Sequence, residues 1–189
     1  MTDSISDVSQ IINWLSILGG DGTSVFTLIR DISAVMGFVV LFIAMIRLTK
    51  HGKAQKMFRY YAPVTTFLMF FSGIMLISMS GYIQMVSSTL FPDARLKSIN
   101  QISSYINDIQ GDGSNVDLAQ QYLVFGLLNI VGFISIIRGM VLLMNVSEGQ
   151  NHTGSIAQVI SHLLAGIVGI NAEFFLHLCS RLYSVKDLF

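Results

Sequence analysis

The chain has 189 residues, with 11 basic and 11 acidic side chains, so its formal net charge at pH 7 is zero. Hydrophobic residues make up 52% of the sequence and charged residues only 12%, whereas soluble domains carry about 25% charged residues. This composition excludes an ordinary soluble domain and predicts an integral membrane protein.

The first predicted element is an amphipathic helix over residues 4–18, where apolar residues recur at spacings of three and four. It ends at a glycine and is followed by the sequence GDGTSV over 20–25, in which Thr23 and Ser24 are residue types that begin helices. We expect GDG to separate a surface-lying helix from a spanning one. A phosphate-binding loop, the alternative, would need more glycines and a lysine. The first 29 residues contain no Lys or Arg, which argues against a cleavable signal peptide.

Four stretches are nearly free of charge and approach the ~20 residues that a helix needs to cross a bilayer. The first reaches full length when 27–30 lie at the interface and Arg47 extends its charged end into the opposite headgroup region. The sequence therefore predicts an all-α membrane protein with four transmembrane helices. The stretches are 32–46, 62–90, 122–137 (continuing past Arg138 to 146) and 155–172.

The loop after the first span predicts the orientation, because it carries five of the eleven basic residues. By the positive-inside rule this loop is cytoplasmic. Both termini and the loop 91–121 then lie outside, and the loop 147–154 must be cytoplasmic although it holds no basic residue. The basic residues of the cytoplasmic loop are Arg47, Lys50, Lys53, Lys56 and Arg59.

The chain contains a sequence repeat. GDGSNV at 111–116 matches GDGTSV at an offset of 91, and the apolar positions of 4–18 recur over 95–109 at the same offset. Further on, the glycines Gly37 and Gly132 align at an offset of 95. We therefore predict a tandem duplication, with a first repeat over 1–91 and a second over 92–189, each an amphipathic helix plus two spans. The amphipathic helices are expected in the headgroup plane, or alternatively packed on a periplasmic partner.

The second repeat has gained ionisable residues in its spans, including Arg138 where the first has Ile43. In the last span, polar and small residues fall on one stripe of a 3.6-residue helix, and small residues let helix backbones approach closely. This stripe is the predicted helix-packing and interaction face. Its residues are Ser161, His162, Ala165, Gly166, Gly169, Glu173 and His177.

Charges inside a membrane face a bundle interior, a cavity or a partner. We expect Arg138 and His162 to be neighbours, and Glu173 to lie near Arg30 or His177. Structural anchoring is the favoured role; a polar channel or inter-subunit contact, and proton or ion coupling, are the alternatives. Glu173 and His177 also offer two metal ligands, but no third or fourth lies nearby in the sequence, so no metal site is predicted.

No catalytic motif is found: the sequence lacks HExxH, GxSxG and a P-loop. The lone Cys179 has no partner for a disulfide within the chain, and we expect an inert, partly buried thiol. We predict neither an enzyme nor a bound cofactor.

The four-span layout, the basic loop and the last span GSIAQVISHLLAG over 154–166 resemble the IcmC/DotE family. These are inner-membrane components of the type IVB (Dot/Icm) secretion system and its conjugative relatives. A shorter component of the same apparatus, IcmD/DotP, is similar to one two-span module.

The resemblance implies a non-enzymatic structural subunit in the bacterial inner membrane, with both termini periplasmic, in an apparatus that exports effectors or DNA–protein complexes. Implied partners are other apparatus subunits, the lipid bilayer and further copies in a homo-oligomer, without direct sequence-specific nucleic acid binding. The alternatives are a pilin-like polymer subunit and a small ion-coupled transporter or channel. The last lacks an expected feature, a helix broken near mid-membrane, because the one proline in a span, Pro63, lies at its end.

Overall fold

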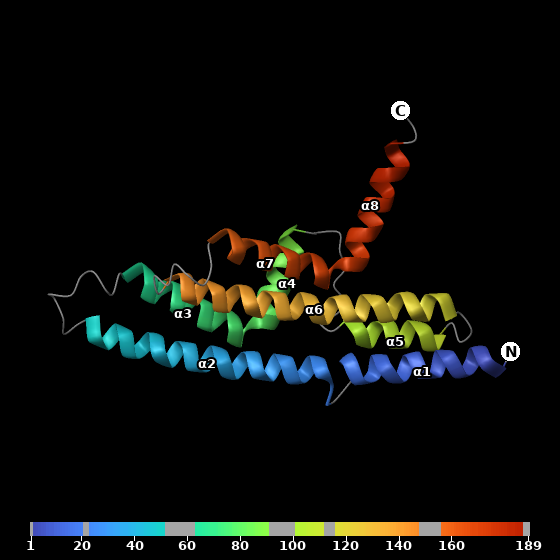
Figure 1. The fold of residues 1–189 in the computed structure, drawn as a ribbon, viewed down its shortest axis with the longest axis horizontal. Coiled ribbons are helices and arrows are strands. Elements are labelled where there is room, and N and C mark those ends of the chain that lie inside the picture. Colours follow the sequence, from blue (N-terminus) through green and yellow to red (C-terminus); the bar gives the residue numbers. More distant parts are fainter. Residues whose placement is uncertain are drawn as a thin grey trace. The chain divides into compact units, whose positions relative to one another are not determined.

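The computed structural model describes residues 2–20, 23–51, 63–90, 101–111, 116–147 and 156–186 (Figure 1). The described residues form α-helices and no strands, which confirms the predicted all-α class. In chain order the helices are α1 (Thr2–Gly19), α2 (Val25–His51), α3 (Pro63–Ile77), α4 (Met79–Leu90), α5 (Gln101–Gly111), α6 (Val116–Ser147), α7 (Ile156–Ile170) and α8 (Ala172–Lys186).

Two helices are long and apolar enough to cross a membrane, over Val25–Thr49 in α2 and Val116–Val146 in α6. The pairs α3/α4 and α7/α8 pass the same test only when each pair is taken together. The described residues therefore hold two to four candidate spans, which indicates a membrane protein. The predicted number of four holds if each pair is one span.

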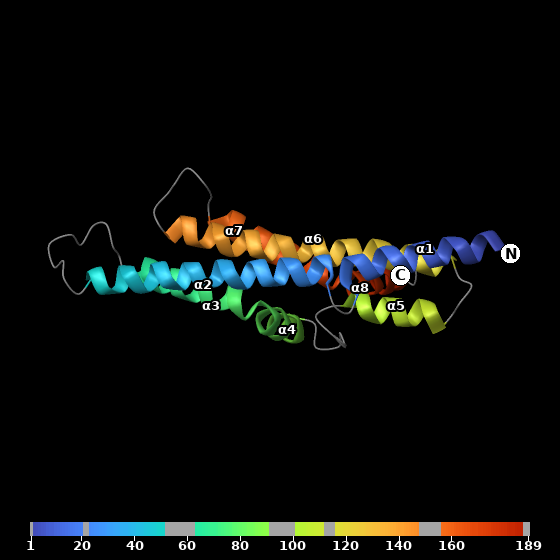
Figure 2. The same cartoon turned by 90° about the horizontal axis from the view of Figure 1, so that it is seen from below.

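Both pairs are sharply bent, by 94° between α3 and α4 and by 83° between α7 and α8. Figure 2 views α4 almost along its axis while α3 runs across the picture, so the turn between them is plain. The apolar stretch 62–90 is therefore not one straight helix, whereas α7 ends at Ile170, two residues before the predicted end of the span 155–172. A first arm of 15 residues is about 22 Å long and does not cross a hydrocarbon core of about 30 Å alone.

The breaks fall at Ser78 and Asn171, not at a proline, although prolines are the commonest cause of kinks. Backbone bonds of the helical type continue through both. Ser78 N–H donates to the Ile74 carbonyl over 2.9 Å, and Asn171 N–H to the Ile167 carbonyl over 3.1 Å. Each bend is therefore made without loss of the local backbone bond at the break residue.

The chain divides into two compact units. The first unit comprises Met1–Leu28, Ile83–Phe133 and Gly166–Phe189, and the second comprises Ile29–Tyr82 and Ile134–Ala165. Each unit draws on both predicted repeats, 1–91 and 92–189, so the units are not the repeats. The repeats remain a prediction about the origin of the sequence.

In the first unit, the two amphipathic helices lie side by side (Figure 1). Ser103 Oγ of α5 donates to the Gly19 carbonyl of α1 over 3.1 Å. Leu15 and Ile102, both fully buried, lie against α6 at Gly126, where a Cβ would be 3.0 Å from Leu15 Cδ2 and 3.6 Å from Ile102 Cγ1. The apolar stripes of α1 and α5 are thus used for packing within the chain, an arrangement that neither sequence-based alternative included.

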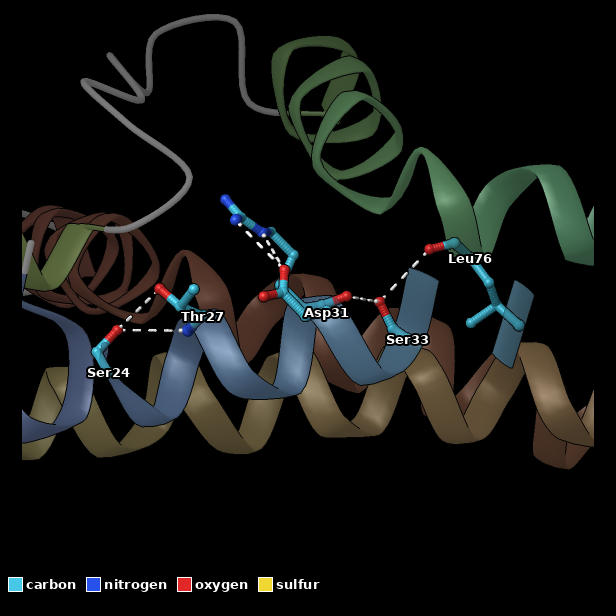
Figure 3. Close-up of polar contacts among 6 residues, drawn as sticks. Ser24, Thr27, Asp31, Ser33 and Leu76 are labelled. Atoms are coloured by element: carbon cyan, nitrogen blue, oxygen red, sulfur yellow. Dashed lines mark hydrogen bonds and ion pairs between the residues drawn. The ribbon is translucent and has the colours of Figure 1, made fainter. Parts of the chain in front are cut away.

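The start of α2 is capped as the sequence predicts. Ser24 Oγ accepts the backbone N–H of Thr27 over 3.3 Å and lies 3.1 Å from Thr27 Oγ1 (Figure 3). This side chain satisfies one of the backbone donors that the first helical turn leaves unpaired. The equivalent residues of the second repeat, Ser114 and Asn115, lie outside the described residues.

Candidate helix-packing and assembly site

In the second unit, α2 and α3 approach closely at a pair of glycines. A Cβ at Gly37 would lie 2.8 Å from the Gly73 carbonyl oxygen, 2.8 Å from Leu76 Cβ and 2.9 Å from Ile77 Cγ1. A backbone oxygen cannot move away without moving its helix, so this approach requires a glycine at 37. The contact lies one turn before the break at Ser78.

In the first unit, α6 and α7 meet in the same way. A Cβ at Gly132 would lie 2.7 Å from the Gly166 carbonyl oxygen, 3.0 Å from the Gly169 carbonyl carbon and 2.8 Å from the Ile170 nitrogen. All three are backbone atoms, and the contact again lies just before a break, here at Asn171.

The two glycine contacts correspond residue by residue. The three neighbours of Gly37, at 73, 76 and 77, lie 93 positions before the three neighbours of Gly132, at 166, 169 and 170. The break residues Ser78 and Asn171 are separated by the same 93 positions. The predicted repeat, which aligns Gly37 with Gly132 at an offset of 95, thus places each glycine against residues that correspond to one another at an offset of 93.

Polar side chains add to these contacts by donating to carbonyls of neighbouring helices. In the second unit, Ser33 Oγ lies 3.4 Å from the Leu76 carbonyl (Figure 3). Ser72 Oγ donates to the Met140 carbonyl over 2.9 Å, and Ser135 Oγ donates to the His162 carbonyl over 2.9 Å. Such bonds are the usual way in which hydroxyls join helices within a membrane.

Two buried asparagines surround the second break, in the first unit. Asn171 Nδ2 donates to Ser87 Oγ of α4 and to the Ile167 carbonyl, each over 2.9 Å. Asn129 Nδ2 of α6 lies 3.5 Å from the Ile170 carbonyl. Within the described part of the chain, the Oδ1 atoms of Asn129 and Asn171 accept no hydrogen bond. Neither asparagine is among the residues predicted to form the interaction face, although a carboxamide inside an apolar stretch is a signal in itself.

The predicted interaction face is divided by the break at Asn171. Gly166 and Gly169 pack on Gly132, as the small residues of that face would require. His162 lies beside Ser135, with Nδ1 3.5 Å from the hydroxyl oxygen. Ser161 and Ala165 are exposed on α7.

Glu173 and His177 lie on α8, beyond the bend of 83°, so they do not continue the line of the α7 residues. His177 is exposed. Glu173 Oε2 lies 3.1 Å from the Tyr105 hydroxyl, which donates to it. Its observed partner is therefore a tyrosine of α5, which was not among the predicted partners. Arg30, one of those predicted partners, forms an exposed ion pair with Asp31 at 3.4 Å.

Tyr105 is the centre of a small aromatic cluster in the first unit. Its ring stacks on Tyr122 with centroids 4.7 Å apart, and the ring of Phe125 is 6.3 Å away. Its hydroxyl also lies 2.9 Å from Gln101 Oε1. Burial, followed by the neighbouring charge of Glu173, raises the pKa of Tyr105 above its usual range. This cluster fixes α5 to the first turn of α8.

The expected proximity of Arg138 and His162 stays a prediction, although the flanking residues of the two helices are in contact, since Ser135 Oγ donates to the His162 carbonyl. Arg138 is exposed on α6, and Arg47 Nη1 lies 3.1 Å from Met69 Sδ of α3. Lys50 belongs to α2, while Lys53, Lys56 and Arg59 lie outside the described residues. Cys179 is exposed on α8, so the prediction of a partly buried thiol is wrong.

The described His, Cys, Asp and Glu side chains form no group of three or more that could hold a metal ion. What the described contacts do is hold one helix against another. No family model, curated protein or solved structure matches this chain.

Proposed function

We propose that this chain is a non-enzymatic, inner-membrane structural subunit of a type IVB secretion or conjugation apparatus, with both termini periplasmic. The observation that supports the proposal is that small and polar residues in its spans make contacts between helices. Gly37 and Gly132 allow backbones to touch, and Ser72 and Ser135 donate to carbonyls of adjacent helices. These residues serve the packing of helices, as the function of a structural subunit requires.

A tandem duplication is part of this proposal. Each half contains an amphipathic helix, a long span and a bent pair in the same order. Each also has a glycine contact with the bent pair that is equivalent residue by residue. Duplication of one packing module supplies two similar surfaces to one chain, which suits a protein that must bind several neighbours.

The proposed partners are lipid and the other subunits of the apparatus. The span in α2 exposes large apolar side chains, including Val35, Phe38 and Phe42, which are 65%, 68% and 59% exposed. Exposed apolar surface of this extent is suited to lipid or to a partner helix. The basic loop at 47–59 is suited to anionic lipid or to a cytoplasmic component of the apparatus.

The proposal is tested by purifying the tagged chain from native membranes in a gentle detergent and identifying what accompanies it by mass spectrometry. Other secretion or conjugation subunits should be recovered with it in a large assembly. Recovery of this chain alone, as a small homo-oligomer, would contradict the proposal.

A second candidate function, a small ion-coupled transporter or channel, is favoured by one specific observation. Discontinuous helices line the binding sites of many transporters, and the α7/α8 break is flanked by buried Asn129 and Asn171, whose Oδ1 atoms lack partners among the described residues. The purified chain in lipid vesicles distinguishes the two functions. Ion flux that Asn129→Leu abolishes, without loss of assembly, would support transport; vesicles that stay impermeable support the structural role.

A further inference from the structure

One of the two breaks is covered by another helix of the same chain. The second arm of the first bent pair, α4, buries Ile83 and Ser87, which are one helical turn apart and 1% and 0% exposed. Ser87 Oγ accepts a hydrogen bond from the Asn171 side chain at the second break, over 2.9 Å. Asn171 itself is only 2% exposed. One face of α4 thus covers the break between α7 and α8.

The equivalent face of the second bent pair is uncovered. The residues 93 positions after Ile83 and Ser87 are Leu176 and Ser180 of α8, an aliphatic residue again followed by a serine. Leu176 is 52% exposed and Ser180 is exposed as well. Figure 1 shows α8 turning sharply away from the end of α7.

The equivalent break is uncovered too. Ser78, at the bend between α3 and α4, is exposed, whereas its counterpart Asn171 is buried. Within each chain, α4 therefore covers the break at Asn171, whereas the equivalent face of α8 and the break at Ser78 are both left exposed. The exposed face of α8 corresponds to the buried face of α4, and the exposed break at Ser78 corresponds to the buried break at Asn171.

We propose that the Leu176/Ser180 face of α8 packs on the Ser78 break of a second copy of this chain. The inference rests on the duplication included in the proposed function. In this contact the Ser78 and Ser180 hydroxyls take the places of the Asn171 amide and the Ser87 hydroxyl, and Leu176 is buried as Ile83 is. Such close packing with interhelical hydrogen bonds drives helix association in membranes.

Lipid alone suits this surface less well than a second copy does. The exposed residues of α8 include Ser180, Arg181 and His177 beside Leu176, and polar groups of this kind are costly against hydrocarbon. The serine at the same position of α4, Ser87, is removed from solvent by protein. The exposed break at Ser78 is a surface of the same chain that can receive Leu176 and Ser180.

The contact is heterologous, because it joins two different surfaces of identical chains. Contacts of this type build a closed ring when the rotation between copies closes, and an open helical filament when it does not. Every copy in such an array has its Ser78 break covered by the preceding copy, except the terminal copy of a filament.

The test is a disulfide cross-link in native membranes. In a Cys179→Ser background, one tagged copy carries Ser78→Cys and a second, differently tagged copy carries Ser180→Cys. Oxidation with copper phenanthroline should give a covalent dimer that contains both tags, several-fold more abundant than with Leu178→Cys in place of Ser180→Cys. Leu178 is a matched control because it is also exposed on α8 but faces away from Leu176 and Ser180 by helical geometry.

A control within one chain tests the observed contact between α4 and the Asn171 break, on which the proposed contact between copies is based. Ser87→Cys and Asn171→Cys in one chain should be joined by a short bifunctional thiol reagent without formation of a dimer, because Asn171 Nδ2 and Ser87 Oγ lie 2.9 Å apart. Leu176→Glu should reduce the Ser78–Ser180 cross-link while the monomer stays folded, since Leu176 is exposed within the chain.

Equal cross-linking by the Leu178→Cys control would overturn the inference, and so would cross-links that form only between two Ser180→Cys copies. Capture of Ser180→Cys by a different protein, with no product between copies, overturns it as well. If the cross-link fails while other apparatus subunits still co-purify, the heterologous contact between copies is contradicted and the proposed secretion role is not. If the cross-link forms but no apparatus subunit co-purifies, the contact between copies is supported and the secretion role is contradicted.

Discussion

At Gly132 the backbone of α7 comes within contact distance of α6, so a single added carbon has no room. The Gly166 oxygen would lie 2.7 Å from it. The same argument applies at Gly37, where the Gly73 oxygen would lie 2.8 Å away. The absence of a side chain at these positions therefore determines how closely the helices pack.

Replacing Gly132 by alanine should destabilise the protein, because overpacking against backbone costs about 1–3 kcal/mol. The matched change Gly81→Ala should be neutral or slightly stabilising, since alanine favours the helix by about 1 kcal/mol over glycine and its Cβ would meet only the Ser78 hydroxyl. Thermal unfolding of both variants in detergent, followed by size-exclusion chromatography, measures the difference. Equal melting temperatures would show that α6 and α7 do not depend on this contact.

Tyr105 should make stability sensitive to alkaline pH. Burial and the charge of Glu173 raise its pKa in the folded protein, while in the unfolded chain tyrosine ionises near pH 10. Below about pH 10 both states hold the proton, and the stabilisation is fully present. As the pH rises further, only the unfolded state loses the proton, so the free energy of unfolding falls.

The check is to compare the wild type with Tyr105→Phe over pH 8–11 by thermal unfolding. The phenylalanine variant should be less stable than wild type at pH 8, because the bonds to Glu173 and Gln101 are lost. It should also lose less stability than wild type between pH 10 and 11. Parallel curves would show that Tyr105 does not contribute to the alkaline transition.

At the scale of elements, the sequence predicts where the apolar helices lie but not that two of them bend. Four apolar stretches correspond to α2, α3/α4, α6 and α7/α8, since hydropathy depends on residue type along the chain. The bends at Ser78 and Asn171 carry no proline signal, and the side-chain bond at Asn171 joins residues 84 positions apart, which a sequence pattern does not reveal. The same reason explains why the Tyr105–Glu173 bond was missed: its residues are 68 positions apart.

The two breaks should respond differently to truncation. Asn171→Ala removes the donor to the buried Ser87 hydroxyl and to the Ile167 carbonyl, and loss of buried hydrogen bonds costs about 1–3 kcal/mol. Ser78→Ala changes an exposed residue and should leave the stability of the monomer almost unchanged. Unfolding of the detergent-solubilised monomers compares the two. A larger loss for Ser78→Ala would show that the break at Ser78 is the one that depends on its side chain.

At the scale of the whole molecule, the predicted orientation depends on one basic loop. Replacing Lys50, Lys53 and Lys56 by glutamate should weaken insertion with this loop in the cytoplasm, because Lys and Arg near span ends set the orientation. Alkaline phosphatase fused to the C-terminus is active only outside the cytoplasm, so its activity should be high in the wild type and should fall in the variant. Exchange of the lysines for arginines keeps the charge and should keep the activity. Unchanged activity in the glutamate variant would contradict the role of the loop.

The bends have a consequence for the membrane itself. With α3 and α7 entering from the cytoplasmic side, as the topology predicts, arms of about 22 Å reach the outer leaflet, and bends of 94° and 83° carry α4 and α8 sideways within it. The amphipathic helices α1 and α5 are expected on the same side. Each bent pair would then displace more lipid from the outer leaflet, where its second arm lies flat, than from the inner leaflet, which only its first arm crosses.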